Sequence, residues 1–199
     1  LNDYPFRRYR IKTLKPKHTF LLPDELEKLE SLELTGKSVT YRHSLEAFLF
    51  CCYTGLRYSD FTQLSEKNIV FIEKRPWIIF TTIKTGAEVR LPLALLFGGK
   101  GWKLLRKHQK HLNEFFNLKA NSTVNKDLIR IGKLAGIQKH FSFHSARHTN
   151  ATLLIYKGVN ITTVQKLLGH RNISTTQIYS EVMATTIVND LKKCSKGNR

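Results

Sequence analysis

The sequence is poor in cysteine and has no long apolar run. Its only cysteines are Cys51, Cys52 and Cys194, and their spacings do not match those of a zinc site. We therefore expect no disulfide framework, no metal centre and a reducing, cytoplasmic environment. No stretch reaches the roughly 18 to 20 apolar residues that a membrane span needs, and the basic start lacks the apolar region of a signal peptide. The sequence thus predicts a protein that neither crosses a membrane nor is exported.

Acidic residues are also scarce. The 199 residues include 15 Asp and Glu against 33 Lys and Arg, which gives a formal net charge of +18. Such an excess indicates a polyanionic partner, most often nucleic acid. Several of the acids gather between positions 24 and 33, so we expect the helix there to face away from the polyanion. Because 41% of the residues are hydrophobic, the chain can bury the core of an ordinary folded domain.

The distribution of charge and proline divides the chain into three parts. Residues 1–18 hold many basic side chains against Asp3 alone, and two prolines discourage a helix, so we expect a basic linker or arm there. Residues 19–193 are expected to form the folded domain, and residues 194–199 a disordered polar tail. Since the chain begins at Leu1 rather than Met, we also expect a further, upstream part of the natural protein.

Hydrophobic periodicity predicts a mainly α domain with a small antiparallel three-stranded β-sheet, an α+β fold. Pro23 and the acids after it predict a helix to about Leu34, and apolar spacing predicts a second over 38–53, stopped at Gly55. β-Branched and aromatic residues predict strands over 69–72, 77–83 and 89–93. Further helices are expected as two basic ones within 100–139 and as short ones over 145–156, 161–168 and from 174 onward.

Uncommon side chains recur at regular spacings in the last third of the chain. His144 and Arg147 stand three residues apart, adjacent on one face of the predicted helix, and His148 follows at once. His170 comes directly after Leu-Gly, and Tyr179 follows nine residues later. The two histidines four apart have the spacing of a helical zinc site, but the glutamate of that motif is missing and an arginine lies between them. We therefore assign them no metal.

These residues resemble the tyrosine recombinases, the phage integrase family, over roughly positions 21–182. The family pattern of His, two residues and Arg-His, followed by Leu-Gly-His and a tyrosine, matches the residues above. The family's earlier Thr-Gly-Leu-Arg pattern, with an acid three residues after the arginine, appears at Arg57 and Asp60. Lys84, in a Lys-Thr-Gly turn, matches the family's hairpin lysine. The resemblance implies a tyrosine recombinase catalytic domain over 19–193, including a C-terminal tail helix.

The chemistry of such a set follows from the needs of a phosphodiester. Negative charge grows on the non-bridging oxygens during attack, so cations must lie there. The planar forks of Arg57 and Arg147 suit phosphate oxygens and can neutralise them without a metal. His170 can donate a further hydrogen bond to the same oxygens. We therefore expect strand cleavage that needs no ATP, no metal and no other cofactor.

The remaining roles concern the nucleophile and its protons. Tyr179 is expected to attack phosphorus and form a 3′-phosphotyrosine, with His144 as the base that takes its proton. Lys84 is expected to be the general acid that protonates the departing 5′ oxygen. The resemblance gives Asp60 the role of orienting the first arginine. We interpret His148 as a buried, hydrogen-bonded histidine that supports the active-site helix.

The basic segment over 100–139 is expected to contact DNA phosphates. The candidate DNA-binding residues there are Lys100, Lys103, Arg106, Lys107, Lys126, Arg130 and Lys133. The expected partner is double-stranded DNA, with no membrane. The resemblance implies a homotetramer on two paired sites, in which the tail over roughly 182–193 docks on a neighbouring subunit. Alone in solution we expect a monomer.

Three other functions fit part of the pattern. A type IB topoisomerase uses the same kind of catalytic set to relax supercoils, but the Leu-Gly-His motif favours a recombinase. A DNA-binding module without catalysis would fit the charge, and it would form no covalent adduct. A metal-dependent nuclease is a third possibility, although the carboxylates outside positions 24–33 are scattered. The primary prediction is a site-specific DNA recombinase or integrase that cuts and rejoins strands through Tyr179.

Overall fold

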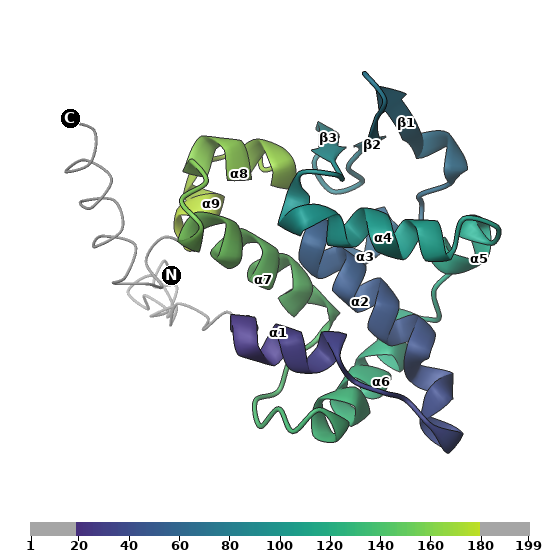
Figure 1. The fold of residues 1–199 in the computed structure, drawn as a ribbon. Helices are drawn as coiled ribbons and strands as arrows, with labels where there is room; N and C mark the ends of the chain where they lie inside the picture. The colour runs from purple at the N-terminus through teal and green to yellow at the C-terminus, as the bar shows by residue number, and fades with distance from the viewer. Residues whose placement is uncertain (1–18, 180–199) are drawn as a thin grey trace, which may run out of the picture.

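The computed structural model describes residues 19–179. Within that range helices form most of the molecule, and a three-stranded sheet lies at one edge (Figure 1). Helix α2 (Arg42–Thr54) runs through the middle and packs against five other α-helices, which are α1 (Pro23–Glu30), α4 (Lys100–Lys107), α5 (Leu112–Phe116), α6 (Asn121–Leu134) and α7 (Phe143–Tyr156). The predicted fold class, mainly helical with a small antiparallel sheet, is therefore confirmed.

The other described helices are short. They are η1 (Gly36–Tyr41), α3 (Tyr58–Phe61), η2 (Glu66–Asn68), η3 (Leu96–Gly99), α5 (Leu112–Phe116), α8 (Ile161–Leu168) and α9 (Ser174–Gln177). Two expectations differ from this arrangement. Helix α1 ends at Glu30 rather than near Leu34, because the backbone N–H and hydroxyl of Ser31 both bond to the carbonyl of Glu27 and close the last turn. The segment over 100–139 forms three helices rather than two.

The central helix α2 is apolar on nearly all sides. Every residue from Ser44 to Thr54 is buried, as a helix in the middle of a helical domain requires. The helix ends at Gly55, whose φ of 75° is left-handed and therefore suits glycine, so the predicted stop is confirmed. The chain then turns at Arg57, which is the N-cap residue of α3.

A cluster of phenylalanine rings fixes α3 against α2 and α5. The ring of Phe61 lies 5.4 Å from the centroids of both Phe115 and Phe116 and 5.9 Å from that of Phe50, each in an edge-to-face arrangement. Pairs of this kind contribute about 0.5 to 1.5 kcal/mol each beyond their buried area. Because Asp60 precedes Phe61 directly, the cluster also holds that carboxylate in place.

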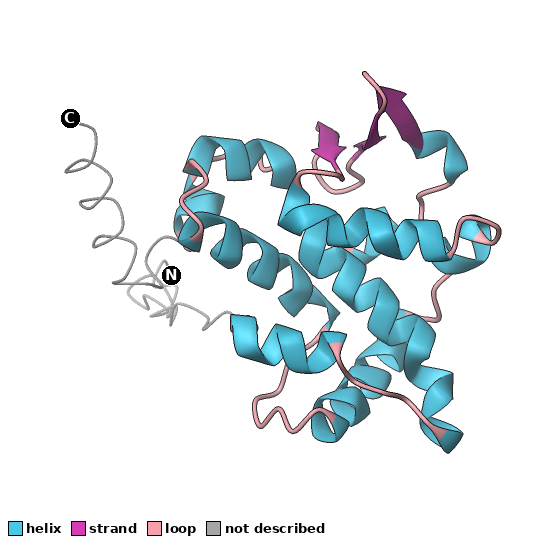
Figure 2. Ribbon diagram, in the orientation of Figure 1, coloured by secondary structure: helices cyan, strands magenta, loops and turns pink. Residues whose placement is uncertain are grey.

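The sheet consists of β1 (Ile69–Ile72), β2 (Arg75–Thr81) and β3 (Glu88–Pro92), antiparallel and in that order (Figure 2). Ile78 in the central strand pairs with Ile69 on one side and Leu91 on the other. The three predicted strands and their antiparallel pairing are thus confirmed. The turn between β2 and β3 carries Lys84, and β3 packs against α8.

Several predictions lie outside the described residues. These are the basic linker or arm over 1–18, the tail helix up to 193 and the polar tail over 194–199. They stay predictions. Between residues 19 and 179, no helix combines the length and the apolar character that a membrane span requires.

Candidate active site

Arg147 lies at the centre of the site, on α7. The residue is 3% exposed, and both terminal nitrogens of its guanidinium donate to backbone carbonyls. Nη1 donates to Gly55 O at 2.8 Å and Nη2 to Leu168 O at 2.6 Å. Burial, together with the charge of Arg57, lowers the pKa of Arg147 to about 9. The guanidinium group of Arg147 therefore links the end of α2 to the end of α8, and its own positive charge lies between them.

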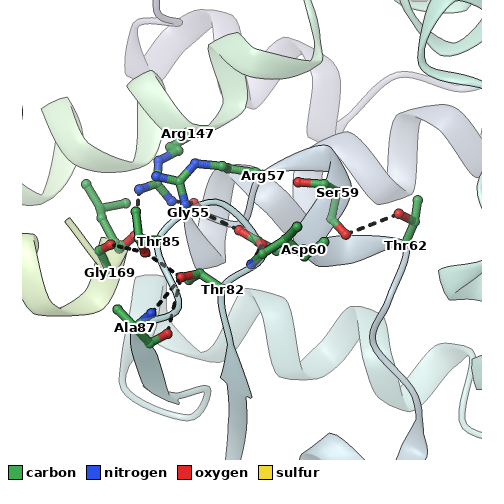
Figure 3. A network of polar contacts seen from close by, with 12 residues as sticks. Gly55, Arg57, Ser59, Asp60, Thr62, Thr82, Thr85, Ala87, Arg147 and Gly169 are labelled. Carbon is green, nitrogen blue, oxygen red and sulfur yellow. Dashed lines mark hydrogen bonds and ion pairs between the residues drawn. The ribbon is translucent and has the colours of Figure 1, made fainter. Parts of the chain in front are cut away.

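Arg57 lies next to Arg147 in Figure 3. Its Nη1 is 3.4 Å from Oδ2 of Asp60, a carboxylate that is almost fully buried. The other carboxylate oxygen accepts a hydrogen bond from the backbone N–H of Ile83 at 3.1 Å. Asp60 therefore links the first arginine to the β2–β3 turn, one residue before Lys84.

Two glycines allow the ends of α2 and α8 to approach closely. A Cβ added to Gly55 would lie 2.7 Å from Cδ2 of Leu168. Gly169 caps α8 with a left-handed φ of 63°, and a Cβ there would lie 2.7 Å from Cγ2 of Val89 and 3.0 Å from Cγ2 of Thr82. The Leu-Gly pair before His170 is thus explained by packing against the loop after α2 and against the hairpin.

His170 follows this glycine and is partly buried. Its Nδ1 lies 2.8 Å from Oγ1 of Thr176, a fully buried hydroxyl. Burial, together with the charges of Arg147, Arg57 and Lys84, lowers the pKa of His170 to about 3. The imidazole is therefore neutral near pH 7. When the threonine hydroxyl donates to Nδ1, Nε2 carries the hydrogen and can donate it to an anion.

Tyr179 is 5% exposed and lies against an imidazole of α7. Its ring centroid is 5.5 Å from that of His148, which is in turn 4.5 Å from that of His144 in an edge-on arrangement. Burial raises the pKa of Tyr179, while the charges of Arg147 and Arg57 act in the opposite direction. The phenol therefore lies within electrostatic reach of both guanidinium groups.

Lys84 is exposed in the turn between β2 and β3. Its charge contributes to the lowered pKa of His170, so the ammonium group lies within electrostatic reach of that imidazole.

The match to known proteins now decides the family. The model of the phage integrase family matches residues 19–185 of the chain. The chain belongs to the phage integrase family. It is 34% identical over 169 residues to a tyrosine recombinase of Pseudothermotoga lettingae, covering 82% of this chain and 56% of that protein. It is 35% identical over 143 residues to the tyrosine recombinase XerA of Saccharolobus solfataricus, covering 70% and 46%.

Solved structures show the same fold. The crystal structure of XerA recombinase matches with a TM-score of 0.66 at 22% identity, over 88% of this chain and 64% of that chain. A lambda integrase dimer bound to a COC′ core site matches with a TM-score of 0.67 at 22% identity, over 85% and 62%. The chain spans about half the length of the curated relatives it matches.

The predicted catalytic residues of this phage integrase family member converge from separate segments. Arg57 follows α2, Lys84 lies in the hairpin, Arg147 lies on α7, His170 follows α8 and Tyr179 follows α9. The charges of Arg57, Lys84 and Arg147 all lower the pKa of His170, so these three groups lie within electrostatic reach of its imidazole.

The two histidines of α7 lie at different depths in the protein. His148, predicted to support the helix, is buried and its ring contacts that of Tyr179. His144, predicted to be the base, is exposed and its ring contacts His148. The three rings therefore form a continuous series from the surface to the phenol.

The seven candidate DNA-binding residues are all exposed, and they lie on α4 and α6. Three of them face carboxylates, since Lys100 pairs with Glu30, Lys107 with buried Glu46, and Arg130 lies 4.0 Å from Asp127. Part of the positive charge of this segment is thus neutralised within the protein.

The sequence analysis did not identify two hydroxyl groups that lie in the candidate site. Thr85 donates to Gly169 O, and Thr176 contacts His170. Threonine is common in turns and at helix ends, so nothing in the sequence separates these two from the rest. In residues 19–179, moreover, no three His, Cys, Asp or Glu side chains are grouped so that they could hold a metal ion.

Proposed function

We propose that the chain carries the catalytic domain of a site-specific DNA recombinase, which cuts and rejoins strands through a 3′-phosphotyrosine on Tyr179. The observation that carries the proposal is the convergence of two guanidinium groups, a neutral imidazole and a phenol on one site. Membership of the phage integrase family and similarity to proteins named tyrosine recombinases support it.

Arg57, Arg147 and His170 have the roles of binding and activating the phosphate. Both guanidinium groups can donate to non-bridging oxygens and oppose the charge that grows there. Because Arg147 is anchored to two carbonyls, its position costs no reorganisation during the reaction. The imidazole of His170 is a neutral donor, held through Nδ1 by Thr176.

Tyr179 and Lys84 have the roles of nucleophile and general acid. The phenolic oxygen forms a bond to phosphorus as the bond from phosphorus to the 5′ oxygen breaks. The phenol's proton passes to a base, for which we propose His144, while Lys84 gives a proton to the departing oxygen. Attack by a 5′ hydroxyl on the phosphotyrosine reverses each step and joins the strands. His148 and Asp60 position the phenol and the first arginine.

The proposed partner is double-stranded DNA, contacted by the seven basic residues of α4 and α6. The lambda integrase structures similar to this chain include a tetramer bound to a Holliday junction, which supports a tetramer on paired sites. We further propose that the protein is a monomer in the absence of DNA and that it acts in the cytoplasm, on nucleoid DNA.

A nicked suicide substrate tests the proposal. The protein should become covalently attached to the DNA at Tyr179, and EDTA should not prevent this. Tyr179→Phe should abolish the adduct, while Tyr156→Phe, a change at an exposed tyrosine of α7, should not. Strand exchange between paired sites distinguishes a recombinase from a topoisomerase, which would relax supercoils without exchange. If no adduct forms under any of these conditions, the proposal is wrong.

A further inference from the structure

The hairpin that carries Lys84 is attached to the body of the protein on both sides of the lysine. Figure 3 shows the attachment of Thr85 to Gly169. On one side, the backbone N–H of Ile83 donates to Oδ1 of Asp60 at 3.1 Å. On the other side, the hydroxyl of Thr85 donates to the carbonyl of Gly169 at 3.0 Å. The lysine is therefore the one residue between two attachments, and the second attachment ends one residue before His170.

The hydroxyl of Thr85 belongs to a network of hydrogen bonds that also includes Thr82 and Ala87 (Figure 3). A carbonyl oxygen only accepts, so the single hydroxyl proton of Thr85 points to Gly169. Oγ1 of Thr82 is 2.5 Å from Oγ1 of Thr85, and while Thr85 donates to Gly169 the proton between the two hydroxyls comes from Thr82. Oγ1 of Thr82 also lies 3.2 Å from the carbonyl of Ala87, a second acceptor for the same proton. Thr82 in turn accepts from the backbone N–H of Ala87 at 3.2 Å. Thr82 is 2% exposed, so water does not compete for its hydroxyl.

The carbonyl that accepts from Thr85 lies beside one already used by the site. Leu168 O accepts from Nη2 of Arg147, and Gly169 O, the next carbonyl, accepts from Thr85. The last carbonyls of α8 have no partners within the helix, so they are free to bind both groups. The end of α8 thus joins the arginine and the lysine hairpin to one short piece of backbone.

We propose that Thr85 is a positioning residue that holds Lys84 for protonation of the departing 5′ oxygen. The inference rests on the proposed function, because it concerns the general acid of that reaction. Without the hydroxyl of Thr85, the segment next to Lys84 would be bonded to the body of the protein only through Asp60, on the side before the lysine. An exposed lysine held on one side only samples many positions. The second attachment restricts the lysine to the side of the turn that faces His170.

Thr85→Val tests the proposal, because it keeps the branched shape and removes the hydroxyl. In the full-length protein, single-turnover cleavage of ordinary DNA should slow by about 10- to 100-fold, part of the about 10²- to 10⁴-fold that a positioned acid contributes. Thr85→Ser keeps the hydroxyl donor, so its cleavage rate should stay within about threefold of the parental rate. That change is smaller than the effect expected from losing one hydrogen bond. Thr81→Val, the same change at an exposed position of β2, is the matched control and should cleave normally.

A substrate with sulfur at the bridging 5′ position separates positioning of the acid from damage to the site. A sulfur leaving group needs no proton, so Thr85→Val should cleave it at the parental rate, as should Lys84→Ala. On ordinary DNA the double variant should be no slower than Lys84→Ala alone, because the two residues act as a unit.

Each other outcome overturns the inference. If sulfur rescues Lys84→Ala but not Thr85→Val, Thr85 has only a structural role and the proposed function stands. If the double variant is slower than Lys84→Ala, Thr85 acts through another group. If sulfur rescues neither, Lys84 is not the acid, and this step of the proposed function fails together with the inference. Melting curves of both variants confirm that the proteins compared are folded.

Discussion

Replacing Gly169 by alanine should destabilise the protein and damage the active site together. The residue has a φ of 63°, which costs an L-residue about 1 to 2 kcal/mol. The added Cβ would lie 2.7 Å from Val89 and 3.0 Å from Thr82. The side-chain and backbone shifts that remove such close contacts in a packed region cost about 1 to 3 kcal/mol. We expect Gly169→Ala to lower the free energy of unfolding by about 2 to 5 kcal/mol, the sum of the two contributions.

Gly136→Ala provides the matched control. Gly136 has a φ of 68°, but a Cβ there meets nothing within 4 Å. It carries the backbone cost without the collision, so its loss should be about 1 to 2 kcal/mol. Urea denaturation of both variants measures the difference, and single-turnover cleavage should fall only in Gly169→Ala, because Thr82 belongs to the hydrogen-bond network of the hairpin. Equal losses of stability in the two variants would refute the packing argument.

Three further predictions follow from the charges of the site and its surroundings. Arg57→Ala should slow cleavage by about 10²- to 10³-fold while leaving DNA affinity nearly unchanged, since one local donor is lost; a parallel loss of binding in a gel-shift assay would contradict this. The pKa of His170 is about 3 in the folded protein against 6.5 for a free histidine, so below pH 6.5 the unfolded chain binds the extra proton and stability falls as the pH falls toward 3. His170→Gln should remove that loss, measured as about 1 kcal/mol at pH 5 after allowance for solvent screening of this partly buried ring. DNA affinity should decrease steeply with salt, and Lys103→Gln or Arg106→Gln should each reduce the log–log slope by about 0.9 if each contacts one phosphate; an unchanged slope would exclude that residue from the interface.

The candidate residues of the site could be selected from the sequence because their chemistry and spacing are unusual together. Arginine, histidine and tyrosine at fixed separations are uncommon, and Gly55 and Gly169 mark helix ends by a conformation that glycine favours. The strands were predictable for a similar local reason. Each is rich in β-branched and aromatic residues, and a Lys-Thr-Gly turn separates the second strand from the third. Local signals of this kind do not depend on the rest of the fold.

The partners of those residues were not predictable, because they come from distant parts of the chain. The carbonyls of Gly55 and Leu168 bind Arg147 only once α2, α7 and α8 have packed. Lys107, a proposed DNA contact, pairs with Glu46 of α2, more than sixty residues away in sequence. Likewise, the break between α4 and α5 depends on tertiary packing, in which the ring of His108 stacks on that of Phe115, 4.4 Å away.

The pair of arginines has a consequence for the energetics of the whole fold. Arg147 is held without solvent beside a second guanidinium, and the two like charges repel one another for as long as the protein stays folded. An oxyanion placed between them converts that repulsion into attraction. If duplex DNA binds the native state, as proposed, it should raise the melting temperature as its concentration rises. The repulsion between the two guanidinium groups therefore makes the unliganded domain less stable than its core alone would make it.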